Sequence, residues 1–205
     1  MNITTTAWFT LTPAGVLRAF GQPKVDDAGQ ALQQLLTGDR TLDALMWADK
    51  AGVDEDGIAG FEAQGWIQRL QRPLQGPDAK LDDFLQHVIA SLSSERRVVL
   101  ASDGGFCLGR SGFEQDEADI LSAAAADFGE FAARQARRGW HGASSYIAFH
   151  ADPEFLLPSH SFVPFWVDDA GYWLVIVGEP LLNSPALVEL LWGIKEAGTR
   201  FAISG

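Results

Sequence analysis

Residues 97–112, RVVLASDGGFCLGRSG, read as two short apolar strands joined by a glycine turn. The VVL run is rich in β-branched residues, and the DGG at residues 103–105 supplies what a tight turn with positive φ requires. On the return strand, Phe106 and Leu108 flank Cys107, the chain's only cysteine. The stretch predicts a β-hairpin whose cysteine is a buried structural residue in the core layer of a sheet.

Two catalytic readings of the hairpin are less favoured. A nucleophilic thiolate needs a basic partner that lowers its pKa, and the neighbours of Cys107 are apolar. The glycines lack the Lys-Ser/Thr ending of a P-loop and the spacing of the dinucleotide fingerprint. With no G-x-S-x-G, H-E-x-x-H or paired-carboxylate signature in the chain, we expect no enzyme and no cofactor, and catalysis is the third alternative.

Helix and strand signals surround the hairpin in a regular order. An amphipathic helix is predicted at Leu81–Leu92 and a long helix at about Glu114–Arg138, with acidic residues at its start and arginines at its end. Three strands follow, and then a helix capped by Ser184 with Pro185 at its first position. The strands are expected at Ser144–His150, Ser161–Val167 and Tyr172–Gly178.

The first 75 residues read as a separate, mostly helical module. Helix starts are predicted at Thr12, at Asp26 or Asp27, at Thr41 and at Asp54. Gly52 and Gly65 are placed to end two of these helices, and a short strand is expected at Trp66–Leu70. The turn-forming RPLQGPDAK at Arg72–Lys80 marks the boundary, which predicts domains at residues 1–75 and 79–205.

The composition restricts the partners. Hydrophobic residues make up 47% of the 205 residues, and the formal net charge is -12, which disfavours nucleic acid and anionic lipid. A single cysteine allows no intramolecular disulfide, so a reducing compartment, the cytoplasm, is expected. No signal peptide is predicted ahead of Arg18, and no apolar run approaches the ~20 residues of a membrane span.

The stretch LLTGDRTLDALMWADKAGVDEDGIAGFEAQGWIQRL resembles a winged-helix domain. In that family the third helix usually enters the DNA major groove, and here it would be Glu55–Gln64, which carries three acidic residues and no Lys or Arg. Residues 1–75 carry nine Asp or Glu against six Lys or Arg. A protein-contact or packing role is therefore favoured. A transcriptional regulator that binds DNA through Arg69, Arg72 and the adjacent loop is the alternative.

The hairpin leading into an alanine-rich helix, and WLVIVGEP leading into the last helix, resemble the Roadblock family of dynein light-chain type over Ala79–Arg200. The resemblance implies an α+β domain with a five-stranded antiparallel sheet sandwiched by helices. It also implies a homodimer in which Ser144–His150 and Glu114–Arg138 of each copy meet. Many relatives are non-catalytic regulators or scaffolds of Ras-like small GTPases, which implies such a partner. The connection ADPEFLLPSH departs from a plain hairpin.

The candidate dimer interface combines a stripe of the long helix with the strand that the resemblance singles out. Its residues are Ala118, Leu121, Ala125, Phe128, Ala132, Tyr146 and Ala148. A second apolar line on the helix runs through Ile120, Ala124 and Phe131. The abundance of alanine permits the close approach of a sheet on one side and of another helix on the other.

Four residues near the end of this strand form a loose set of nitrogen and oxygen donors. His150, Asp152, Glu154 and His160 are conceivable metal ligands, but they lack the local helix spacing of an established zinc motif. Ordinary loop histidines are the favoured interpretation, and no metal is expected.

Overall fold

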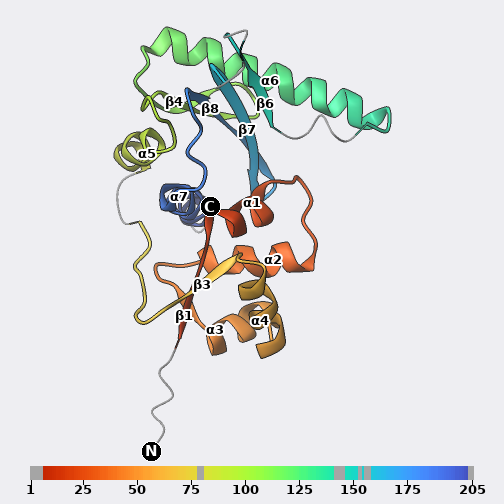
Figure 1. Cartoon of the computed structure of the whole chain (residues 1–205), viewed down its shortest axis with the longest axis vertical. Helices are drawn as coiled ribbons and strands as arrows, with labels where there is room; N and C mark the ends of the chain where they lie inside the picture. The colour runs from red at the N-terminus through yellow and green to blue at the C-terminus, as the bar shows by residue number, and fades with distance from the viewer. Residues whose placement is uncertain (1–6, 78–80, 141–145, 152–153, 155–157, 203–205) are drawn as a thin grey trace, which may run out of the picture.

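The computed structural model describes residues 7–77, 81–140, 146–151, 154 and 158–202. Figure 1 shows a small lower part built from the N-terminal residues and an upper part built around a larger sheet. The elements, in chain order, are β1 (Trp8–Leu11), α1 (Pro13–Phe20), α2 (Asp27–Gln33), the 3-10 helix η1 (Gln34–Leu36), β2 (Leu42–Asp43), α3 (Ala44–Ala51), α4 (Glu55–Ala63), β3 (Ile67–Leu70), α5 (Leu81–Ala90), β4 (Val98–Ser102), β5 (Cys107–Ser111), α6 (Gln115–Arg137), β6 (Ile147–Phe149), β7 (His160–Val167), β8 (Ala170–Val177) and α7 (Pro185–Ala202).

Local capping signals explain the N-terminal helices. The Thr12 hydroxyl accepts a hydrogen bond from the Gly15 amide, and Asp26 and Asp54 cap α2 and α4 in the same way. Gly52 ends α3 with a φ of 66°, a left-handed conformation that favours glycine. These predicted helix starts and the predicted stop at Gly52 are confirmed.

The predicted cap at Thr41 is wrong. The N-cap of α3 is Asp43, whose side chain accepts from the Met46 amide. Thr41 is fully buried, and its hydroxyl accepts instead from the Leu74 amide at 3.0 Å. The helix starts later because Leu42 and Asp43 pair with β1 and form β2.

A three-stranded sheet in the order β2-β1-β3 connects the N-terminal helices. β1 lies in the middle and pairs antiparallel with both neighbours, Trp8 opposite Asp43 on one side and opposite Leu70 on the other. The predicted strand at Trp66–Leu70 is confirmed as β3. β1 was not expected from the sequence, and assignment of this module to the winged-helix class stays a prediction.

The larger sheet has the order β5-β4-β8-β7-β6, with every neighbouring pair antiparallel. One face packs against α6 through a cluster that includes Val99, Ala125 and Val175. The other face packs against α5 and α7 through residues such as Ile89 and Leu191. The predicted five-stranded antiparallel sheet with helices on both faces is confirmed (Figure 1).

The hairpin of residues 97–112 forms, but its return strand is not in the core layer. β5 is an edge strand, and its Leu108 is 42% exposed, while Phe106, just before β5, is 74% exposed. Cys107 is half-buried and points toward the cluster under α6. Cys107 thus packs against an apolar cluster, but the expected core positions of its neighbours Phe106 and Leu108 were wrong, because the hairpin lies at the edge of the sheet.

One hydrophobic cluster runs from the N-terminal helices into the upper part. Leu35, Leu36 and Trp47 belong to it together with Leu174 and Leu191. The loop after η1 is also bonded to α7, because the Gly38 amide donates to Glu196 Oε1 at 2.6 Å and the Gly38 carbonyl accepts from Trp192 Nε1 at 2.9 Å. The boundary at residues 72–80 thus separates two segments of sequence that share a core.

Within the described residues, no helix has both the length and the hydropathy that crossing a bilayer requires.

Candidate functional site

The residues at both ends of the 23-residue helix α6 stabilise it by capping and by charge. The Glu114 amide donates to the Glu117 carboxylate at 3.3 Å, which satisfies a free donor at the helix start. Arg134 and Arg137 lie in the last turn, where they complement the helix dipole, and Gly139 follows with a φ of 87°. In Figure 1 the C-terminal part of α6 extends past the sheet, so this end has solvent on most sides.

The predicted alanine stripe faces the chain's own sheet. Ala118 and Ala125 are fully buried and Ala132 is 8% exposed. Leu121 and Phe128 are half-buried at the margin of the same cluster. Because the three alanines are covered within a single chain, a second copy could gain little area from them. Their place in a dimer interface stays a prediction.

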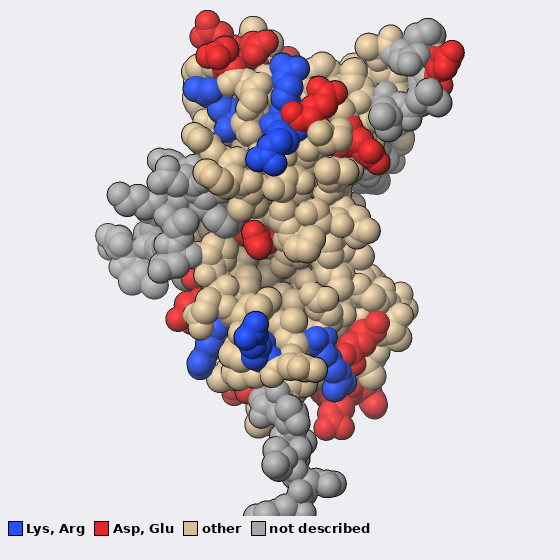
Figure 2. Space-filling view, turned by 60° about the vertical axis from the view of Figure 1, so that its left-hand side comes forward, with Lys and Arg blue, Asp and Glu red and all other residues tan. Residues whose placement is uncertain are grey.

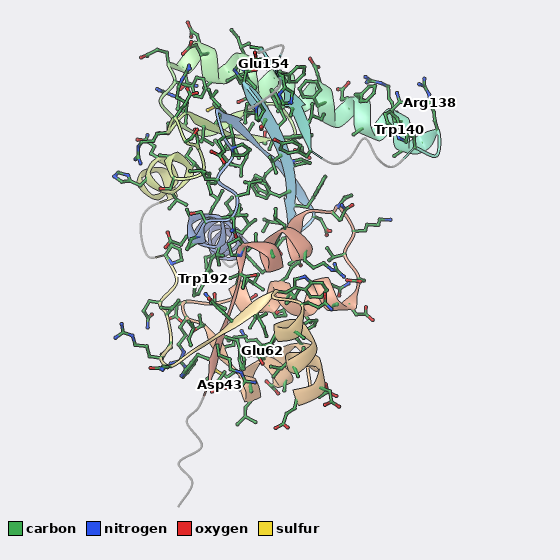
Figure 3. All side chains as sticks on the ribbon, in the orientation of Figure 1. Asp43, Glu62, Arg138, Trp140, Glu154 and Trp192 are labelled. Atoms are coloured by element: carbon green, nitrogen blue, oxygen red, sulfur yellow. The ribbon has the colours of Figure 1, made fainter. Side chains whose placement is uncertain are left out.

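The neighbouring line of α6 is open. Ile120 is 70% exposed and Phe131 is 38% exposed, while Ala124 is half-buried between them. Trp140, just beyond the helix, is 56% exposed and meets Phe131 edge to face, with ring centroids 6.3 Å apart. Figure 3 shows Trp140 beside Arg138 at the far end of α6. Exposed aromatic side chains of this size are typical of interaction surfaces.

The edge strand β6 continues this apolar surface. Phe149 is 47% exposed, and its ring lies 5.6 Å from that of Phe128 on α6 and 5.8 Å from that of Phe162 on β7. Among the described strands β6 pairs with β7 alone, so no described strand pairs with its other edge. We call Ile120, Phe131, Trp140, Phe149 and the open edge of β6 the α6–β6 surface.

Tyr146 and Ala148, which were predicted to belong to the interface, lie on the other face of the strand. The Tyr146 hydroxyl is 2.8 Å from Ser161 Oγ, and Ser161 pairs with Ala148. Since side chains alternate along a strand, Phe149 points to the α6 side and Tyr146 to the α7 side. Sequence reasoning did not single out Phe149, although the alternation of Ile147 and Phe149 in YIAFH could have shown which face it joins.

Cys107 is not activated as a nucleophile. Burial raises the pKa of its thiol, and the negative charge of Asp119 raises it further. The thiol sulfur lies 3.7 Å from the Gly109 carbonyl. At neutral pH the protonated thiol dominates, which suits a structural residue.

The described members of the predicted donor set, His150, Glu154 and His160, do not form a metal site. Within residues 7–77, 81–140, 146–151, 154 and 158–202, no three His, Cys, Asp or Glu side chains are grouped so that they could hold a metal ion. His160 lies in β7 opposite Phe149, and Asp152 lies outside the described residues.

The helix that would enter DNA in the winged-helix reading is acidic at its start. Asp43, Glu55 and Asp56 line a depression of about 730 Å³ over α3 and α4. Arg69, a proposed DNA contact, donates two hydrogen bonds to Glu62, at 2.5 and 2.9 Å, and this pairing lowers the pKa of the Glu62 carboxyl. Figure 2 shows basic and acidic side chains interspersed on this part rather than a basic patch, an arrangement that disfavours DNA.

Comparison with protein-family models gives no match, and comparison with curated proteins gives none either. Two solved structures are similar over 62% of this chain. One is a Roadblock/LC7 domain from Streptomyces avermitilis, with 16% identity, full coverage of that domain (100%) and a TM-score of 0.38. The other is MglB of Myxococcus xanthus, with 17% identity, 95% coverage and a TM-score of 0.36. Both similarities are weak, and neither decides what this chain does.

Proposed function

We propose that this chain is a non-catalytic interaction protein that forms a homodimer through the α6–β6 surface. The observation that carries the proposal is the adjacency of exposed aromatic side chains and a strand edge with which no described strand pairs. Phe149 on β6 is in ring contact with Phe128 of α6, so the strand and the helix present one continuous surface.

A second copy fits this surface for two physical reasons. Pairing two β6 strands edge to edge would satisfy the open backbone groups of both. A two-fold axis brings the same patch of each copy together, so Ile120, Phe131 and Phe149 of one copy would be removed from water against the same apolar patch of the other. Ala118 and Ala125 stay with their own sheet in this arrangement.

Light scattering with a matched pair of variants tests the dimer. We expect the wild type to have about twice the 22.2 kDa mass of the chain. Phe149→Glu places a charge in the interface and gives the monomer mass. Leu45→Glu is the control, because Leu45 is 83% exposed on α3, away from this surface, and it keeps the dimer. A monomeric wild type, or a dimeric Phe149→Glu protein, contradicts the proposal.

The partner that we propose to test first is a Ras-like small GTPase, the class that the sequence resemblance implies. A GTPase recovered from native extract with the wild type and identified by mass spectrometry is then purified and titrated in its GDP and GTP-analogue forms. Binding that differs between the two nucleotide states supports a regulator. Equal binding to both supports a scaffold, and no binding to either contradicts the GTPase proposal.

We propose that the N-terminal module contacts protein rather than DNA. Its acidic α4 and the Glu62–Arg69 pair support this. Fluorescence anisotropy with duplex DNA is expected to show no binding at physiological salt. Tight binding that weakens steeply as salt rises would contradict the proposal and favour the transcriptional-regulator alternative.

A further inference from the structure

A groove of about 590 Å³ lies between the N-terminal sheet and α7, away from the α6–β6 surface. Its apolar walls come from β1, from the segment after β3 and from the first turns of α7. Figure 3 shows Trp192 below α7, facing this segment. The apolar lining residues are Leu11, Pro13, Leu74, Pro77, Pro185, Val188 and Trp192. The volume falls in the range of small-molecule sites, which runs from about 300 to 1,000 Å³.

Neutral polar groups face the groove without partners. Thr10 lines the groove and is only 3% exposed, and its hydroxyl has no hydrogen-bond partner among the described residues. Among described residues, the one fully buried side-chain polar atom without a partner is Thr37 Oγ1, so the Thr10 hydroxyl must be accessible from the groove. Gln68 is paired opposite Thr10 and shares its face. Water can bond this hydroxyl in the free protein, and a polar group of a ligand can take the place of that water.

The charge of the groove is negative and comes from one residue. Glu189 is the single charged side chain among the described residues that line it. Within the described chain, Glu189 has no ion-pair partner. Figure 2 agrees with this, since it shows an almost uncharged band at mid-height between two charged ends of the molecule. An anion would meet repulsion here, and a single positive charge would meet attraction.

We propose that this groove binds a small amphipathic monocation, an amine on an apolar body about the size of one aromatic ring. The ammonium group pairs with Glu189, and the apolar body packs against Leu11, Val188 and Trp192. The Thr10 hydroxyl and the neighbouring amides receive the polar groups of the ligand. Because the walls come from both sides of the 72–80 boundary, the ligand binds only when β1 and α7 are correctly packed, and it stabilises that packing.

Titration of the full-length protein with three matched probes tests the charge preference. The probes are phenethylamine, the neutral 2-phenylethanol and the anionic 3-phenylpropionate, and binding is followed by calorimetry. We expect the amine to bind about tenfold more tightly than the alcohol, because it gains one ion pair at a partly exposed site. We expect the anion to bind more weakly than the alcohol. Equal affinities for the three probes would overturn the proposal. So would the absence of amine binding at concentrations up to about 10 mM, which is on the order of the weakest specific affinities.

Substitutions at the rim locate the binding. Glu189→Gln removes the charge of an exposed side chain, so we expect it to lower amine affinity about tenfold and to leave the alcohol unchanged. Glu179→Gln is the matched control, since Glu179 is exposed and lies outside the groove. Asn183→Trp fills the groove from its exposed rim and is expected to abolish binding of both probes. If the amine binds Asn183→Trp or Glu189→Gln as it binds the wild type, the groove is not the site.

Discussion

Replacing Trp192 by Phe tests whether the bond between α7 and the N-terminal module holds the molecule together. Trp192 is 4% exposed, and its indole nitrogen donates to the Gly38 carbonyl at 2.9 Å. The variant keeps an aromatic ring but leaves a part-buried carbonyl unpaired, which costs about 1–3 kcal/mol. Its smaller ring also loses packing against Gly76, where the indole lies so close that an added Cβ would be 3.0 Å from it, at about 1 kcal/mol.

The sum is a loss of about 2–4 kcal/mol in the free energy of unfolding. Urea unfolding followed by circular dichroism measures it, and with a slope of about 2 kcal/mol/M the midpoint falls by about 1–2 M. Trp140→Phe is the matched control, because Trp140 is 56% exposed, and it is expected to change stability by less than about 0.5 kcal/mol. A Trp192→Phe protein as stable as the control, or one that unfolds in two separate steps, would refute the idea of a core shared across the boundary.

Three further predictions concern individual side chains. Ala125→Glu places a charge at a fully buried position and is expected to lower the free energy of unfolding by more than about 3 kcal/mol. Ala123→Glu, at an exposed position on another face of α6, is expected to change it by less than about 0.5 kcal/mol. Equal thermal midpoints for the two variants would contradict the packing of α6. Because Arg69 lowers the pKa of Glu62, the ion pair stabilises the folded state above the ordinary glutamate pKa and this stability is lost as pH falls. Glu62→Gln therefore removes an acid-sensitive contribution below about 1 kcal/mol, and an unchanged pH profile of unfolding would speak against the pair. The raised pKa of Cys107 predicts slow alkylation by iodoacetamide at pH 7 and faster reaction at pH 9, and a rate that does not change with pH would contradict it.

Elements with strong local signals were predictable from the sequence. Thr12 followed by Pro13, and Asp54 ahead of α4, mark helix starts because their side chains bond to amides only three residues away. α6 was predictable for a similar reason, since its acidic start, basic end and terminal glycine all act within one or two turns.

Elements that depend on distant partners were not predictable in the same way. β1 has only four residues, and its partners in β2 and β3 lie far along the chain. Leu42 and Asp43 join that sheet, which displaces the cap of α3 from Thr41 to Asp43. Phe106 and Leu108 have the alternation of a half-buried strand, but nothing in the hairpin itself shows that β5 ends up at the edge of the sheet.

The elements that form the candidate surface were named from the sequence, but the side chains that these elements expose were not. The family resemblance implied that the long helix and the strand near residue 147 meet between two copies, and this stays a prediction. Within one chain, Phe128 of α6 is in ring contact with Phe149 of β6. Which alanine line faces the sheet depends on the direction from which α6 crosses it, a choice settled by packing against β4 and β8. The groove beside Trp192 had no local signal at all, because its walls meet only after the whole chain has folded.

The continuous core has a consequence for the history of this chain. A module that passes between genes as a separable piece needs a polar surface toward its neighbour. Leu36 and Leu191, from opposite ends of the sequence, are instead buried in one cluster. The segments before and after residues 72–80 therefore pack against each other in one core. A core substitution in one segment is tolerated only when the side chains of the other segment accommodate it. The two halves are expected to be inherited together and to drift as a pair.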